Sequence, residues 1–203
     1  MLLDFVGQQV ESQKEMWMLK TIDSYEESLI NAIAQLNTLE VTTAALLILD
    51  TIQQGGTIYT CGNGGSASTA SHMVCDLVKN TGKNMKVVCL NDSISTLTAY
   101  ANDIEYDAVF SEPLSKMIGE DDLLIAISTS GESKNVLAAI EVAKVFNASI
   151  VLLTGPDMQS RAMISLYKYP HAVKINVTSD NIGVIEDVHL VVNHMLTEII
   201  RGI

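Results

Sequence analysis

The chain contains few basic residues and little proline. Its 203 residues include 12 Lys and Arg against 24 Asp and Glu, which gives a formal net charge of −12. Such a charge opposes nonspecific attraction to nucleic acid or to an anionic membrane, so an anionic substrate would need a local, specific pocket. Only three prolines and 48% hydrophobic residues exclude a collagen-like or disordered chain, and they supply apolar material for one sizeable domain.

Cysteine is also scarce, and long apolar runs are absent from the sequence. Cys61, Cys75 and Cys89 are odd in number and show no C-x-x-C spacing, which favours a reducing compartment. The N-terminus shows no basic stretch followed by an apolar segment. Apolar runs such as Leu123–Ile127 are far shorter than the roughly 20 residues of a spanning helix. We therefore expect a soluble, cytoplasmic protein with no membrane or nucleic-acid partner.

The periodicity of the apolar residues predicts an α/β fold. Residues 1–54 carry apolar side chains at spacings of three and four, typical of two amphipathic helices that pack on the domain or on a second subunit. Short apolar runs follow, typical of parallel strands buried on both faces: Thr57–Cys61, Lys86–Leu90, Leu123–Ile127, Ser149–Leu153 and Val173–Val177. Helix-like segments alternate with them: Ser66–Lys79, Ser93–Ala101, Asp107–Met117, Ser133–Phe146, Met158–Ser165 and Gly183–Arg201.

This alternation predicts a doubly wound, five-stranded parallel sheet sandwiched by helices. We find no internal repeat, low-complexity tract or linker that would divide the chain. We therefore expect a single domain over residues 1–203, with an N-terminal helical extension over residues 1–54 for packing and oligomerisation and an α/β core over residues 55–203.

Two polar loops directly follow predicted strands, where α/β sheets bind ligands. Gly62–Ser66 combines three glycines with the polar side chains of Asn63 and Ser66, and Ser128–Ser133 offers hydroxyl groups at the start of a helix. Either loop alone is explained by turns and helix caps, but both together favour phosphate binding. Neither matches G-x-x-x-x-G-K-[ST] or G-x-G-x-x-G, which argues against nucleoside triphosphates and dinucleotides.

Four side chains on two predicted helices have the chemistry of a metal site. His72 and Asp76 are four residues apart, and Glu186 and His194 are eight apart, so each pair lies on one helix face. Two imidazoles and two carboxylates suit Zn²⁺ or another divalent transition metal, with His189 as an alternative ligand. Solvated helix faces and unrelated imidazoles would explain the same spacings.

Several segments together resemble the sugar-isomerase (SIS) domain and, within it, the phosphoheptose isomerases. They are CGNGGSASTASH (61–72), ANDIEYDAVF (101–110), ISTSGES-x-NVL (127–137) and IEDVHLVVNHML (185–196). The resemblance extends over nearly the whole chain. The serine loop is typical of the superfamily at large, whereas the His72 helix combined with the Glu186 and His194 helix is typical of the heptose-isomerase branch.

The resemblance implies a role for each matching position. Substrate or phosphate contacts fall on Asn63, Gly64, Gly65, Ser66, Asn102, Asp103, Ser128, Thr129, Ser130 and Ser133, and zinc ligands on His72, Asp76, Glu186 and His194. In the best-known branch the residue at the Asp76 position is Glu, acting as base and ligand, and the residue at the Glu186 position is Gln. Both positions differ here: Asp76 has a shorter side chain, and Glu186 adds a second carboxylate that makes the site more anionic. Either Asp76 or Glu186 is a candidate base, with His194 as the candidate acid.

The implied activity is isomerisation of sedoheptulose 7-phosphate to D-glycero-D-manno-heptose 7-phosphate through an enediol, in a homotetramer whose active sites are shared between subunits. An isomerase of another phosphosugar is one alternative. A non-catalytic SIS scaffold of the kind that binds the initiator DnaA is a second, and the two histidines and two carboxylates argue against it. A sugar-phosphate-sensing regulator is a third, but the acidic N-terminus shows no basic DNA-binding face.

Overall fold

A five-stranded parallel sheet forms the centre of the molecule, with the strand order β2-β1-β3-β4-β5. The computed structural model describes the backbone of residues 2–203 and the side chains of residues 13–203. The strands are Thr57–Gly62 (β1), Lys86–Cys89 (β2), Leu123–Ser128 (β3), Ser149–Thr154 (β4) and Ala172–Asn176 (β5). The predicted sheet is confirmed, and each strand agrees with its predicted bounds to within one residue at either end.

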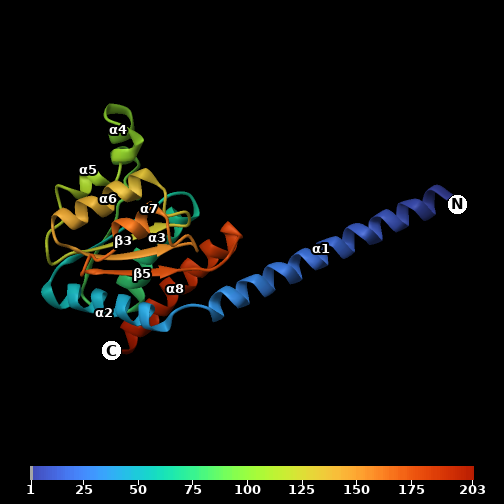
Figure 1. Ribbon diagram of the computed structural model, residues 1–203, viewed down its shortest axis with the longest axis horizontal. Helices are drawn as coiled ribbons and strands as arrows, with labels where there is room; N and C mark the ends of the chain where they lie inside the picture. The colour runs from blue at the N-terminus through green and yellow to red at the C-terminus, as the bar shows by residue number, and fades with distance from the viewer. Residues whose placement is uncertain (1) are drawn as a thin grey trace.

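Helices cover both faces of this sheet (Figure 1). One face packs against α2 (Thr38–Gln54), α3 (Gly65–Cys75) and α8 (Ile182–Gly202), and the other against α5 (Ser111–Leu114), α6 (Lys134–Val145) and α7 (Arg161–Ser165). Strand β3 alternates between the two cores: Ile125 and Ile127 face the first, while Leu124 and Ala126 face the second. Because both faces are buried, the strand has no polar alternation, which explains its continuous apolar sequence.

The two N-terminal helices differ in how they pack. Helix α2 buries apolar residues such as Ala44 and Ile48 in the core. Helix α1 (Leu2–Ala34) extends away from the sandwich (Figure 1), and near its C-terminal end it packs against the first turns of α8. The Tyr25 hydroxyl there donates a 2.6 Å hydrogen bond to the Asp187 carboxylate, and this bond raises the pKa of Tyr25 to about 12.

Within residues 13–203, none of the helices has by itself the length and apolar composition of a membrane span. The segment Gln13–Ala34 and helix α2, which meet at an angle of 67°, have that length and composition only when taken together.

Two helix predictions need correction. The single helix expected over Asp107–Met117 is wrong, because this segment forms the 3₁₀ turn η2 (Tyr106–Ala108) and the short α5. Pro113 has no N–H to donate, and its ring crowds the carbonyl four residues earlier, so one helix cannot run through it. The helix expected over Ser66–Lys79 ends as α-helix at Cys75 and continues as the π-helical turn η1 (Asp76–Asn80). Turns of this kind are frequent at functional sites.

Candidate functional site

The two polar loops lie next to each other at the carboxyl edge of the sheet. Strands β1 and β3 are paired, and the register sets Gly62 beside Ile127 at their ends. After β1 the chain continues to β2 on one side, and β3 lies on the other side. This reversal of strand order is the point at which open α/β sheets bind ligands. The structure therefore brings together the two loops that the sequence predicts as a phosphosugar site.

Side-chain amides join the two loops. Asn63 donates a 2.8 Å hydrogen bond to Asn135 Oδ1, and Asn135 returns a 2.9 Å bond to Asn63 Oδ1. The Tyr106 hydroxyl donates to the same Asn63 oxygen at 2.9 Å. Asn63 is consequently fixed by three bonds, and one of its two amide N–H groups is left for a ligand. Sequence reasoning missed Asn135 and Tyr106 as site residues, although both stand inside the segments that carry the resemblance.

The hydroxyl groups of the serine loop have two different roles. Ser128 is buried, and its Oγ donates to Ser133 Oγ at 3.2 Å and accepts the Gly131 N–H at 3.2 Å. Ser133 precedes the first turn of α6, and Thr129 and Ser130 lie between these serines at intermediate and exposed positions. Ser128 therefore holds the shape of the loop, and Ser130 Oγ adds to it by accepting the Glu132 N–H at 3.1 Å. The hydroxyl hydrogens of Thr129, Ser130 and Ser133 can still be donated to an anion.

An ion pair holds the serine loop against the first turn of α7. Glu132 accepts the Arg161 backbone N–H at 2.7 Å and the Arg161 Nε–H at 2.5 Å. These hydrogen bonds, the backbone bond first, lower the pKa of the Glu132 carboxyl. Ala162 also donates to the Gly131 carbonyl at 3.0 Å. The loop is thus anchored from outside before any ligand binds.

Three of the four expected metal ligands converge on one point. His72 Nε2 lies 3.2 Å from Asp76 Oδ2, His194 Nε2 lies 3.5 Å from the same oxygen, and the two Nε2 atoms are 3.4 Å apart. Helices α3 and α8, which pack against each other, supply the two imidazoles, and Asp76 begins the π-helical turn. The π-helical turn thus places the Asp76 carboxylate within 3.5 Å of both imidazoles.

The spacing of these three atoms fits a tetrahedral metal ion. Nitrogen and oxygen ligands bind zinc at about 2.1 Å, so two ligand atoms of a tetrahedral site lie about 3.4 Å apart. The three observed separations of 3.2, 3.4 and 3.5 Å agree with that edge length. The Asp76 side chain is only 8% exposed, whereas the His72 and His194 side chains are 49% and 54% exposed. Catalytic zinc sites have three protein ligands and an open fourth position, and the two exposed imidazoles leave this group of three accessible to solvent.

Glu186 is not a member of this group of three. Its half-buried carboxylate lies against Gly65, at the N-terminus of α3, where a Cβ atom on residue 65 would collide with it. Eight residues of helix rise by roughly 12 Å, which places Glu186 two turns away from His194. The role of Glu186 as a metal ligand stays a prediction, and its carboxylate lies beside the glycine loop.

The remaining predicted residues lie apart from the metal group. Asn102 and Asp103 are exposed at the end of α4 (Ile94–Asp103) and are hydrogen-bonded to each other at 2.8 Å. His189 is fully buried, with its Nε2 3.2 Å from the Thr154 carbonyl oxygen. Its burial lowers the pKa of the imidazole to about 4. His189 is therefore a neutral core residue here, and the expectation that it replaces another ligand finds no support in its position.

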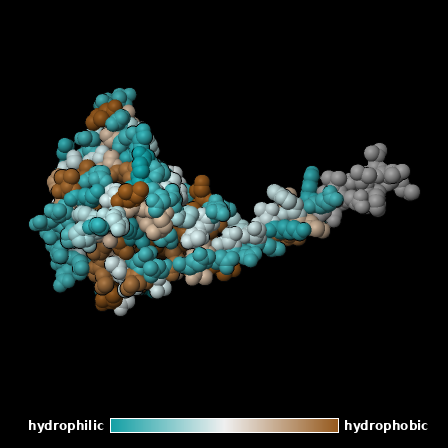
Figure 2. All heavy atoms as spheres, viewed as in Figure 1, coloured by the Kyte–Doolittle hydropathy of each residue, from teal (hydrophilic) through white to brown (hydrophobic). Residues whose placement is uncertain are grey.

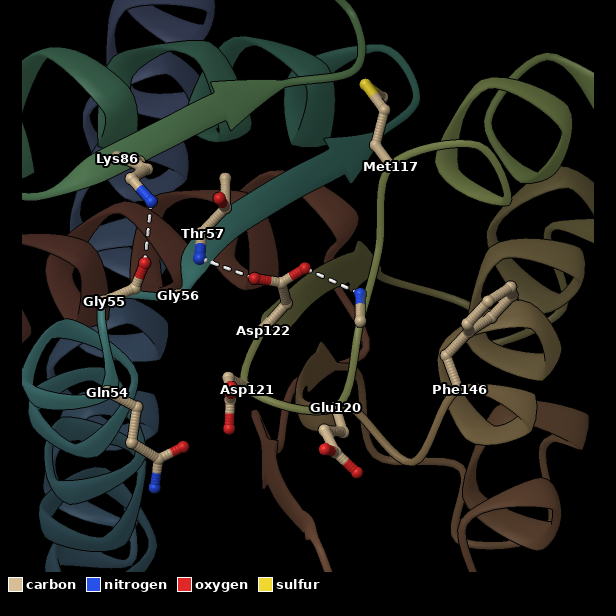
Figure 3. A pocket seen from close by; sticks show the side chains of 11 residues that line it. Gln54, Gly55, Gly56, Thr57, Lys86, Met117, Glu120, Asp121, Asp122 and Phe146 are labelled. Carbon is tan, nitrogen blue, oxygen red and sulfur yellow. Dashed lines mark hydrogen bonds between the residues drawn. The ribbon is translucent and has the colours of Figure 1, made fainter.

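A separate hollow lies at the opposite edge of the sheet, where β1 and β3 begin (Figure 3). The Asp122 carboxylate accepts the backbone N–H groups of Thr57 and Gly119, each at 2.7 Å, and Lys86 donates to the Gly55 carbonyl at 2.7 Å. These contacts fix the starts of the two strands. Asp122 and Lys86 are thus used within the protein, whereas the carboxyl edge holds both predicted ligand loops, so the carboxyl edge is the better candidate site.

Comparisons with known proteins agree with this geometry. The model of the SIS domain family matches residues 24–155. The chain is 38% identical to a phosphoheptose isomerase from Colwellia psychrerythraea, over 90% of this chain and 95% of that protein. It is 35% identical to one from Alteromonas mediterranea, over 87% and 90%.

A solved structure described as a phosphoheptose isomerase, from Neisseria gonorrhoeae, superposes with a TM-score of 0.84 at 29% identity and covers 92% of this chain and 100% of that chain. Sequence and structure thus agree on the SIS fold over nearly the full length. The chain belongs to the SIS-domain family and, within it, to the phosphoheptose isomerases.

Proposed function

We propose that this protein is an aldose–ketose isomerase that converts sedoheptulose 7-phosphate to D-glycero-D-manno-heptose 7-phosphate through an enediol. The observation that carries this proposal is the group of His72, Asp76 and His194 beside two linked loops at the carboxyl edge of the sheet. The curated relatives named phosphoheptose isomerase support the choice of substrate. A non-catalytic scaffold would not need three ligand atoms at tetrahedral separations.

The distal phosphate of the substrate is assigned to the serine loop. Thr129, Ser130 and Ser133 supply hydroxyl donors, and the N-terminus of the 12-residue helix α6 faces the same loop. Binding energy from this end of the sugar holds the reacting end in place. Asn63 contributes its one remaining N–H to the sugar, and its three internal bonds keep that N–H directed.

Proton transfer between C1 and C2 requires a base that faces the substrate. Both Asp76 oxygens accept side-chain amide hydrogen bonds, from Asn80 and from Asn193, and one of them faces the two imidazoles. Glu186 lies beside Gly65 in the glycine loop. This arrangement favours Glu186 as the base and Asp76 as a metal ligand. His194 Nε2 cannot hold a metal ion and donate a proton at the same time, so its ligand and acid roles exclude each other at that atom.

Zinc, or another divalent ion, is proposed as the cofactor. His72, Asp76 and His194 would hold it, and a bound ion would act as a Lewis acid toward the C1 and C2 oxygens of the substrate. The donor set of two imidazoles and one carboxylate also accommodates other transition metals. We further place the protein in the cytoplasm, which agrees with its three unpaired cysteines.

The proposal is tested by proton NMR of sedoheptulose 7-phosphate in D₂O with the purified protein, with and without a chelator. We expect aldose product and deuterium at C1 or C2, both lost with chelator and restored by Zn²⁺. Glu186→Gln should stop exchange and keep Zn²⁺ binding, whereas Asp76→Asn should lose both. A silent spectrum with zinc bound would contradict this substrate, and a panel of other sugar phosphates would then separate a different isomerase from a scaffold.

We also propose that the protein acts as a homotetramer with shared active sites. In the described part of α1, residues 13–34, several apolar side chains are exposed, among them Trp17, Leu19 and Ile22, which are 67%, 62% and 54% exposed. An apolar groove between α1, α2 and α8 reaches His194 itself. Figure 2 shows further hydrophobic surface at the projecting end of α4. A second copy covering the groove would lie directly beside His194 of the metal group.

Light scattering coupled to size-exclusion chromatography tests this assembly. We expect a mass of four chains for the wild type and a smaller species for Trp17→Glu, because a buried charge would oppose association. Lys20→Glu, a charge change on the same helix, is the control. A wild-type protein that elutes as a monomer would refute the tetramer.

A further inference from the structure

One buried amide contacts the centre of the metal group and has no assigned role. Asn193 is 0% exposed and lies on α8 directly before His194. Its Nδ2 donates a 2.7 Å hydrogen bond to Asp76 Oδ2. A second amide, that of Asn80, donates to the other oxygen, Asp76 Oδ1, at 2.9 Å. The two oxygens of one carboxylate are therefore held by different residues.

The oxygen held by Asn193 is the one that faces the imidazoles. Asp76 Oδ2 is the atom 3.2 Å from His72 Nε2 and 3.5 Å from His194 Nε2. A carboxylate oxygen has two lone-pair directions, so the bond from Asn193 occupies one and leaves the other directed at the metal group. The Asn80 bond, by contrast, is made to Oδ1, which is not the oxygen in closest contact with the imidazoles.

Asn193 makes its hydrogen bond through the side-chain N–H and not through the side-chain oxygen. Its Oδ1 atom is buried and has no hydrogen-bond partner among the described residues. A reversed amide would set Oδ1 against the Asp76 carboxylate, so the orientation is fixed by the donated bond. An apolar side chain of similar size would avoid the unpaired oxygen. Packing alone therefore does not explain an asparagine at this position.

We propose that Asn193 is a positioning residue for the metal centre, which orients Asp76 Oδ2 toward the ion held with His72 and His194. This inference rests on the proposed metal centre. Loss of the hydrogen-bond partner of a metal ligand typically lowers metal affinity by about 10–100-fold, and we expect this loss for the bond to Oδ2, the oxygen that faces the imidazoles. Because Asn193 and His194 are neighbours on α8, one rigid helix sets both the carboxylate direction and the second imidazole.

The test measures Zn²⁺ affinity of the full chain by competition with a chromophoric chelator, together with the visible absorption of bound Co²⁺. Asn193→Ala removes the bond to Oδ2, and Asn80→Ala is the matched control that removes the bond to Oδ1. Thr197→Val controls for loss of a buried polar group on α8, since the Thr197 hydroxyl donates to the Asn193 carbonyl at 3.0 Å. Asn193→Leu fills the volume if the alanine variant folds poorly, and circular dichroism of the metal-free proteins verifies folding.

We expect Zn²⁺ affinity to fall about 10–100-fold in both Asn193 variants, with an altered Co²⁺ spectrum, and to change less than about 3-fold in Asn80→Ala and Thr197→Val. Equal losses in Asn193→Ala and Asn80→Ala, or wild-type affinity in the Asn193 variants, would overturn the inference alone. A wild type that binds Zn²⁺ no better than His72→Ala would instead overturn the metal centre, and with it this inference.

Discussion

Gly131→Ala should lower the free energy of unfolding more than the same substitution at another glycine with a positive φ. Gly131 has a φ of +64°, and a Cβ atom there would meet the side chain of Ser160. Ser160 is 1% exposed, so its side chain cannot move aside into solvent. Gly55 is the matched control, because it also adopts the left-handed conformation, with a φ of +76°, and an added Cβ meets nothing within 4 Å.

The two substitutions differ in how many effects destabilise the folded protein. Left-handed backbone costs a residue with a Cβ atom about 1 kcal/mol, and this applies at both positions. Overpacking a filled site adds about 1–3 kcal/mol, and this applies only to Gly131. We therefore expect a loss of about 1 kcal/mol of unfolding free energy for Gly55→Ala and about 2–4 kcal/mol for Gly131→Ala.

Urea unfolding followed by circular dichroism at one protein concentration measures both losses. Adding Ser160→Gly should recover the overpacking part in Gly131→Ala but not the backbone part, after correction for Ser160→Gly alone. The displaced loop should also raise KM for the phosphosugar, whereas Gly55→Ala should not. Equal losses at the two glycines, or no recovery in the double variant, would refute the reasoning about Ser160.

Two further predictions concern single side chains. Burial holds the pKa of His189 at about 4, below its ordinary value of 6.5, so the unfolded chain binds a proton in this range that the folded chain does not. The contribution of His189 to the free energy of unfolding should therefore be complete above pH 6.5, and the free energy should fall by up to about 3 kcal/mol toward pH 4. His189→Gln should make this pH dependence weaker, as measured by urea titrations at several pH values. Tyr106→Phe removes one donor to Asn63 and should raise KM about 2–10-fold with unchanged Zn²⁺ affinity. Isomerase kinetics identical to wild type would show that the Tyr106 bond does not orient Asn63.

Much of the fold follows from local patterns in the sequence. Strand β3, with its unbroken run from Leu123 to Ile127, needs two covered faces, and that requirement already predicts a parallel sheet between helices. The polar loops were located by their place after such strands. The prediction of one helix over Asp107–Met117 was wrong because it relied on the spacing of apolar residues and neglected Pro113. The missing N–H and the bulk of the proline ring prevent a continuous helix there.

The metal group was predictable in part. The spacing of His72 and Asp76 on one helix places two ligands together, since residues four apart share a face. Spacing could not tell which of Glu186, His189 and His194 on α8 would join them. That depends on how α8 crosses α3, which brings His194 to the group, buries His189 and leaves Glu186 over Gly65.

The sequence by itself determined the sheet, the two ligand loops and the chemical types of the site residues, because these depend on periodicity, turn residues and donor chemistry within short segments. Only the tertiary structure decided the contacts between segments distant in the chain: Asn63 with Asn135, and Asn193 with Asp76. Such bonds depend on the relative positions of packed helices to within a few tenths of an ångström, because hydrogen bonds weaken steeply outside a narrow range of distance and angle. No local pattern contains that information.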